Sequence, residues 1–162
     1  SSPLPHRQID LNSELVIVGP LTMADYLKRT SLVTPISGNK YEISKLDQWA
    51  GNLESEFQTA LVKNLSVLDT QRVFVRYPSF LSIQSHYNLR VDVLRFDAGI
   101  NGQVRLEASW AWVDNNSKVH AGGHFSKTEQ VGQGNGKYSI EATVAAQSVL
   151  LQQLSQEVLK AL

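Results

Sequence analysis

The chain has 162 residues, which is enough for one domain with a sizeable hydrophobic core. Lysine plus arginine equals aspartate plus glutamate, at 15 residues each, and the basic residues are scattered singly, which argues against nucleic acid as the main partner. The absence of cysteine excludes disulfides, thiolate metal sites and cysteine nucleophiles within this sequence.

The first elements predicted along the chain are a tether and a buried strand. Residues 1–12 are polar and contain two prolines, so we expect a flexible tether there and a single domain over residues 13–162. The continuous apolar run at residues 15–18 predicts a strand that is buried on both faces and ends at Gly19-Pro20. Between this strand and the first helix we expect only short elements, namely a helical turn near residues 25–28 and strands at residues 32–34 and 41–43.

The clearest periodicity predicts an amphipathic helix that begins after Ser44. Ser44 can cap this helix, with Asp47 three residues further on in the capping-box pattern. Apolar residues then recur at spacings of three and four, which places them on one face of a helix. The members of this stripe are Leu46, Ala50, Leu53, Phe57, Leu61, Leu65 and Leu68. The alternating residues 72–76 predict a strand that ends at Pro78.

Three further strands are predicted to form an antiparallel meander. Polar and apolar residues alternate along residues 86–97 until Leu94 and Phe96 break the parity, which indicates a bulge or a face covered by a helix. Asn101-Gly102 is the strongest hairpin signal in the chain, and a third strand is expected to return at residues 118–127. The residues of the middle strand that share its apolar face are Val104, Leu106, Ala108, Trp110 and Trp112.

The remaining residues predict a loop and a long helix. Residues 128–137 are polar and rich in glycine, which is typical of a loop, and apolar residues keep helical spacing over residues 138–162. The sequence shows no internal repeat and no domain boundary. The order of elements therefore favours an α/β fold, in which two main helices pack on a mixed β-sheet that contains the antiparallel meander.

No pattern in the sequence makes a convincing catalytic, cofactor or metal site. His120 and His124 are four residues apart, but they lie in a predicted strand beside two glycines, so two exposed histidines are the favoured interpretation. Residues 132–137 resemble a phosphate loop only superficially, because Val131 stands where that loop needs glycine and Tyr138 follows the lysine. We therefore predict no enzymatic activity, no cofactor and no metal ion, with a hydrolase as a minor alternative.

Two other sets of side chains leave alternatives open. Asp92, Asp97 and Glu107 could pair as a catalytic acid and base, although carboxylates on half-buried strands usually form a solvated face. Trp110 and Trp112 share one strand face, and core packing is the default interpretation for both. The alternative is a partner surface or a lipid-facing groove, because exposed tryptophans often anchor interfaces.

Several short motifs follow one another in an order that is typical of one protein family. They are residues 20–29, which contain Tyr26-Leu27-Lys28-Arg29, the helix segments 49–53 and 64–66, the strand segments 91–98 and 108–110, and the terminal helix segment 146–158. In this order they resemble the ABC-type transport auxiliary lipoproteins, the PqiC/YmbA-like family of the Pqi lipid-transport system. The resemblance covers nearly the whole chain.

This resemblance implies a non-enzymatic lipoprotein with a three-layer α/β domain and a mixed sheet. The precursor would carry a signal peptide and a lipobox cysteine upstream of Ser1. Its acyl chains would anchor the protein to the periplasmic face of the outer membrane of a Gram-negative bacterium. The partner would be a periplasm-spanning MCE-domain protein of the Pqi type, in a lipid transport system that supports membrane integrity. A homo-oligomeric ring would match the rotational symmetry of a tubular partner.

Two functional hypotheses result from these expectations. In the first, the domain docks the end of the MCE protein, and the residues expected at the partner surface are Tyr26, Leu27, Arg29 and Trp112. Packing of Tyr26 and Leu27 with a solvated Arg29 is an equally good interpretation of that segment. In the second hypothesis, the domain is a periplasmic carrier that itself binds a lipid or another apolar ligand between the sheet and a helix.

Overall fold

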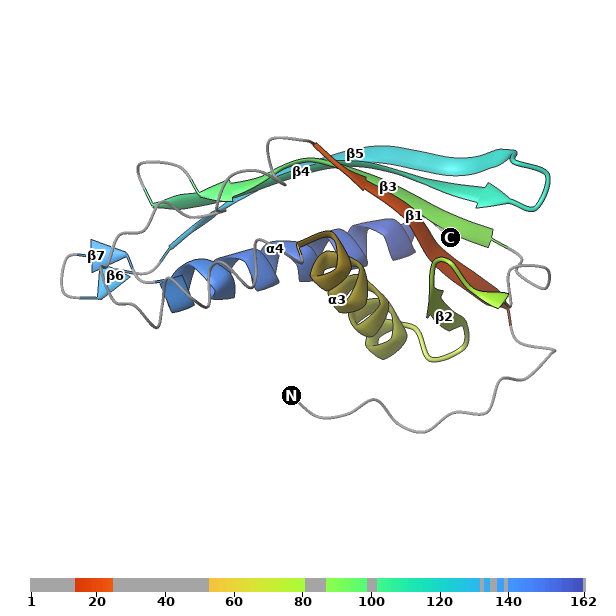
Figure 1. The fold of residues 1–162 in the computed structure, drawn as a ribbon, viewed down its shortest axis with the longest axis horizontal. Helices are drawn as coiled ribbons and strands as arrows, with labels where there is room; N and C mark the ends of the chain where they lie inside the picture. Colours follow the sequence, from red (N-terminus) through yellow and green to blue (C-terminus); the bar gives the residue numbers. More distant parts are fainter. Residues whose placement is uncertain are drawn as a thin grey trace.

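The computed structural model contains a five-stranded sheet with both of its described helices on one face (Figure 1). The structure describes residues 14–24, 53–80, 87–98, 102–131, 133–134, 137–138 and 140–161. The strands of the main sheet are β1 (Leu15–Met23), β2 (Val73–Arg76), β3 (Tyr87–Ala98), β4 (Gln103–Asp114) and β5 (Val119–Gln130). The helices are α3 (Leu53–Leu68) and α4 (Ile140–Lys160), and β6 (Gln133–Gly134) pairs with β7 (Lys137–Tyr138) as a separate small hairpin.

The strand order β2-β1-β3-β4-β5 confirms the expected mixed sheet. Strand β1 runs parallel to β2 and β3, whereas β3, β4 and β5 form the antiparallel meander in the other half. Three layers were expected from the family resemblance, but the described residues form two. The physical reason is that β3 and β4 alternate between buried apolar and more exposed polar residues, so each offers a helix only one apolar face.

The two helices divide the covered face of the sheet between them. Helix α3 packs on β1 and β2, α4 packs on β4 and β5, and the helices contact each other (Figure 1). The predicted stripe of α3 is buried from Leu53 to Leu65, but Leu68 is 41 % exposed, so the stripe ends one turn earlier than predicted. In α4, Leu150, Leu154 and Val158 are fully buried against the sheet.

Strand β1 was predicted to end at Gly19-Pro20, and this prediction is wrong. The strand continues to Met23, and its register with β3 shifts between Val18 and Leu21. Gly19 permits this irregularity because its φ of 135° is rarely adopted by other residues, and a Cβ there would lie 2.4 Å from the Cβ of Tyr77. The Gly-Pro pair therefore forms a bulge inside one strand.

The meander follows the sequence pattern closely. The irregularity predicted near Leu94 is a register shift between Val93 and Arg95, and Gly102 has the positive φ, 70°, that the hairpin needs. Strand β5 extends to Gln130, three residues further than predicted, because β4 supplies pairing partners along its whole length. The predicted loop at residues 128–137 is therefore partly strand, both in β5 and in the β6–β7 hairpin.

Some predictions lie outside the described residues. They are the tether at residues 1–12, the short elements at residues 25–28, 32–34 and 41–43, and the start of the first helix at Ser44. Among the helices that the structure describes, none combines the length and the apolar character that a bilayer crossing requires.

Candidate partner surface on the open face of the sheet

The face of the sheet opposite the helices carries the candidate functional surface, because polar side chains gather there. Along β3, Leu89, Val91 and Val93 are at most 3 % exposed and face the helices, whereas Arg90 and Asp92 are exposed on the opposite face. This alternation follows directly from the two-residue period of a strand. The described part of this face is therefore a polar surface in contact with water.

Charged residues on this face oppose one another across neighbouring strands. Arg95 pairs in register with Glu107, and Asp97 pairs with Arg105. Ion pairs also run along single strands, from Arg95 Nε to Asp97 Oδ1 at 3.6 Å and from Arg105 to Glu107 at 3.5 Å. These side chains are between about a fifth and a half exposed, so each pair contributes at most about 1 kcal/mol of stability. We call these four residues the charge ladder.

His124 contacts both Ser109 and Glu107, the latter a member of the charge ladder. The His124 ring lies 3.2 Å from Ser109 Oγ through Nδ1 and 3.4 Å from Glu107 Oε1 through Nε2. The order of these groups resembles that of a hydrolase triad, but Ser109 lies in the middle of β4, where its neighbours on both sides are paired strands. Backbone amides that are used in sheet pairing cannot also form an oxyanion hole, and the His124 side chain is 50 % exposed to water. This geometry favours a solvated polar cluster.

The second histidine, His120, lies at the start of β5, beside the β4–β5 turn. His120 Nε2 lies 2.7 Å from Asp114 Oδ2, and the His120 ring packs edge-on against Tyr87. The His120 hydrogen bond, together with backbone N–H groups of the turn, lowers the pKa of the Asp114 carboxyl. Within the part of the chain that the structure describes, no three histidine or carboxylate side chains gather as metal ligands would.

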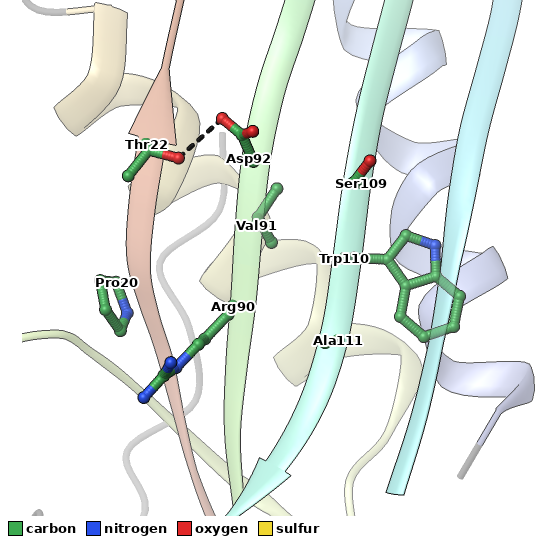
Figure 2. Close-up of a pocket in the computed structure, with 8 residues that line it drawn as sticks. All are labelled: Pro20, Thr22, Arg90, Val91, Asp92, Ser109, Trp110 and Ala111. Atoms are coloured by element: carbon green, nitrogen blue, oxygen red, sulfur yellow. Dashed lines mark hydrogen bonds between the residues drawn. The ribbon is translucent and has the colours of Figure 1, made fainter. Parts of the chain in front are cut away.

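A hollow of about 370 Å³ opens on this face between β1, β3 and β4, and Figure 2 shows its lining residues. We call it the Arg90 pocket; it is lined by Pro20, Thr22, Arg90, Val91, Asp92, Ser109, Trp110 and Ala111. Thr22 Oγ1 donates a hydrogen bond of 2.7 Å to Asp92 Oδ1. In Figure 2 the Arg90 side chain extends from β3 toward Pro20, away from Asp92. A cationic group and a carboxylate therefore occupy different ends of one hollow.

The residues predicted to contact a partner are not brought together by the described structure. Tyr26, Leu27 and Arg29 lie outside the described residues. Trp112 is fully buried between the sheet and α4, where its Nε1 donates a 2.9 Å hydrogen bond to the Val158 carbonyl. Trp112 is therefore a core residue, which was the default interpretation. Its side chain has no exposed surface through which it could contact a partner.

Arg90 and Thr22 were not singled out from the sequence. The alternating pattern of β3 does predict that Arg90 and Asp92 point away from the core. The pattern does not predict the parallel strand pairing that places Thr22 beside Asp92, 70 residues apart in the chain. The hollow therefore depends on a non-local strand register that local motifs do not predict.

The described residues form an α/β protein whose exposed polar and charged side chains gather on the open face of its sheet. The family model of the ABC-type transport auxiliary lipoprotein component matches residues 1–159. The chain therefore belongs to this family of lipoproteins, which assist ABC-type transport in the bacterial envelope. A search of curated proteins finds no match.

Solved structures show the same fold at low sequence identity. One protein described only as uncharacterised matches with a TM-score of 0.66 and 16 % identity, over 94 % of each chain. A Xanthomonas campestris protein of the DUF330 family matches with a TM-score of 0.60 and 16 % identity, over 90 % of this chain and 81 % of that one. PelC from Paraburkholderia phytofirmans, solved as a dodecamer, matches with a TM-score of 0.53 and 12 % identity, over 94 % and 92 %.

Proposed function

We propose that this protein is a non-enzymatic auxiliary lipoprotein that docks a periplasm-spanning MCE-domain protein at the outer membrane. The match of the family model over residues 1–159 is the observation that carries the proposal, because it covers both the domain and the segment before it. Residues 1–12 would act as the tether between a lipidated cysteine and the domain at residues 13–162. Acyl chains on that cysteine would hold the protein on the periplasmic face of the membrane.

The described surface supports a docking role over a catalytic one. The histidines and carboxylates described above lie on strands or at the β4–β5 turn, and their ion pairs and hydrogen bonds join them to one another. A hydrolase needs its nucleophile, base and oxyanion donors to converge on one substrate atom. A broad, polar, partly charged surface is instead typical of a site where another protein binds.

The carrier hypothesis remains the second candidate, and the core disfavours it. The space between the sheet and the helices holds large, fully buried side chains, including Trp112 and Phe57. The rings of Phe57 and Phe96 pack edge to face with centroids 5.2 Å apart. A lipid chain would have to displace such groups. Native mass spectrometry of the purified protein tests the hypothesis, since co-purifying phospholipid would favour a carrier.

Self-association would fit the proposed role. PelC, which shares the fold, was solved as a dodecamer, and a ring of this chain would match a tubular partner by symmetry. Mass photometry of the lipidated protein in detergent should then show one closed oligomer. A strict monomer at micromolar concentration would remove the ring from the proposal without affecting the docking role.

Co-purification tests the docking role directly. The full-length lipoprotein, tagged at its C-terminus, is produced together with an MCE-domain protein from the same bacterium and isolated from detergent-solubilised envelopes. We expect the MCE protein to be retained with the lipoprotein and not with an unrelated, equally tagged outer-membrane lipoprotein. Reproducible absence of the complex, with both proteins folded and in the envelope, would refute the proposed function.

A further inference from the structure

Arg90 differs from the other arginines of the open face because no acidic residue of the described strands lies across from it. Arg95 and Arg105 each face a carboxylate on the neighbouring strand. Arg90 instead pairs in register with Ala111, and Pro20 lies on its other side in the pocket wall. Within the described residues, no hydrogen bond or ion pair engages its guanidinium group. The cross-strand pairing of opposite charges seen in the charge ladder therefore does not extend to Arg90.

The pocket does not neutralise Arg90 internally. Asp92 is the nearest carboxylate along β3, but its Oδ1 accepts the Thr22 hydrogen bond at 2.7 Å. Figure 2 shows the two side chains directed to different ends of the hollow, Arg90 toward Pro20 and Asp92 toward Thr22. Arg90 is exposed at this hollow, and the planar fork of its guanidinium group favours a planar, bidentate anion such as a carboxylate.

We propose that the Arg90 pocket receives an acidic side chain of the docked partner protein, carried by a segment whose neighbouring residues are small or apolar. This proposal rests on the docking function and assigns a place and a chemistry to it. The charges are complementary, because an aspartate or glutamate of the partner would give Arg90 the ion pair that Arg95 and Arg105 already have. The apolar contribution of Pro20 and Ala111 would favour small or apolar residues beside that acid.

A protein segment fits this site better than a lipid does. The volume of about 370 Å³ accommodates one or two side chains, near the lower end of the range for ligand pockets. The hollow is open on the face of the sheet and does not enclose a channel, so an acyl chain placed there would remain largely in water. An extended segment lying across strands can place one side chain in such a hollow and hydrogen-bond to the polar groups around it.

Site-specific photo-cross-linking in the intact complex tests the proposal. A benzoylphenylalanine is placed at position 111, inside the pocket, and for comparison at position 156, an exposed position on α4. Both variants are produced as full-length lipoproteins together with the MCE partner and irradiated in the envelope. We expect cross-links to the MCE protein from position 111 and not from position 156, with the attachment point next to an aspartate or glutamate.

Two neutralising substitutions then test the role of the charge. Arg90→Gln removes the guanidinium group, and we expect the cross-linked product to fall about tenfold, as for a charge pair that becomes partly buried at an interface. Arg95→Gln is the matched control, because it removes the same charge from the same strand and face. It should change the yield by about twofold or less, as expected for an exposed charge. Equal losses in both variants would overturn the proposal by showing a general charge effect.

The other outcomes separate this inference from the docking function. Cross-links from position 111 to a second copy of the chain would assign the pocket to self-association and overturn the proposal. A photoproduct with the mass of a phospholipid would overturn it in favour of lipid binding. If the complex co-purifies but position 111 yields no cross-link, the pocket proposal fails while docking stands. If the unsubstituted proteins do not co-purify at all, the docking function itself fails.

Discussion

The side chain of Gln58 should contribute measurably to stability, because it ties α3 to the bulge of β1. Its Nε2 donates hydrogen bonds to the carbonyls of Val18, at 2.9 Å, and Tyr77, at 2.8 Å. Gln58 is only 8 % exposed, which is unusual for a glutamine on a helix. The two bonds hold β1, α3 and the end of β2 together beside Gly19.

The substitution Gln58→Met removes both donated bonds while keeping a side chain of similar length and helix propensity. It also removes the Oε1 acceptor of two longer hydrogen bonds from Arg76, at 3.3 and 3.4 Å, which we expect to add little. A hydrogen bond of this kind contributes about 0.5–1.5 kcal/mol net, so two bonds predict a loss of about 1–3 kcal/mol in the free energy of unfolding. The Val18 carbonyl keeps a second bond from the Tyr77 N–H at 3.1 Å, which places the expected loss near the middle of this range. For a chain of this size a loss of about 2 kcal/mol lowers Tm by roughly 4–8 °C.

Urea unfolding followed by circular dichroism measures this effect, with Gln156→Met as the matched control on the exposed side of α4. We expect the control to remain within about 0.5 kcal/mol of the unsubstituted protein, as surface substitutions usually do. If Gln58→Met is equally neutral, the two hydrogen bonds do not stabilise the fold and the reasoning is refuted. A change in the slope of the transition would instead indicate altered denatured-state structure.

Three further substitutions test other parts of the structure by the same unfolding measurement. Gly19→Ala combines a positive φ with a Cβ placed 2.4 Å from Tyr77, so we expect a loss of at least about 2 kcal/mol, and a neutral result would contradict the bulge. Trp112→Phe removes the hydrogen bond to the Val158 carbonyl, and a loss of about 1–2 kcal/mol is expected; an unchanged midpoint would show that this bond adds nothing. Asp114→Asn tests pH dependence. The His120 hydrogen bond lowers the folded-state pKa of Asp114 below 3.8, so its contribution is present above that pH and is lost as the pH falls through the folded-state pKa. The variant should therefore lose less stability on acidification from pH 5 to pH 2, a range of about three units around that value, and an unchanged acid limb would exclude this role of Asp114.

Local patterns predicted the elements of this fold well where one face of each element is buried. The stripe from Leu53 to Leu65 and the alternation of β4 both appear in the structure, because a single period suffices to place their apolar residues in the core. The same patterns failed at Gly19-Pro20, since turn residues inside a strand look like its end. That the strand continues past Gly19-Pro20 is evident only from its pairing with β3 and from the Gln58 hydrogen bond to Val18.

The candidate surface could be predicted only in part, for a related reason. The outward direction of Arg90 follows from strand alternation, but its lack of an acidic neighbour depends on the pairing of β3 with β4 and β1. Trp112 shows the converse, because residue type alone made it a partner candidate, whereas its hydrogen bond to Val158 explains it as part of the core. Residue type and period predict which side chains are exposed, while register decides which of them lie together.

The one-sided sheet links fold to function. Because both described helices pack on one face, the described residues of the opposite face are exposed to water and accessible to a partner. A polar face that pairs its own charges gains little from binding, since each exposed ion pair is already formed. Arg90, set between Pro20 and Ala111, is where an incoming carboxylate would gain a partner without displacing one that the described residues provide. A partner segment with lysine at this position would meet a like charge, so the same residue that favours an acidic segment also rejects a basic one.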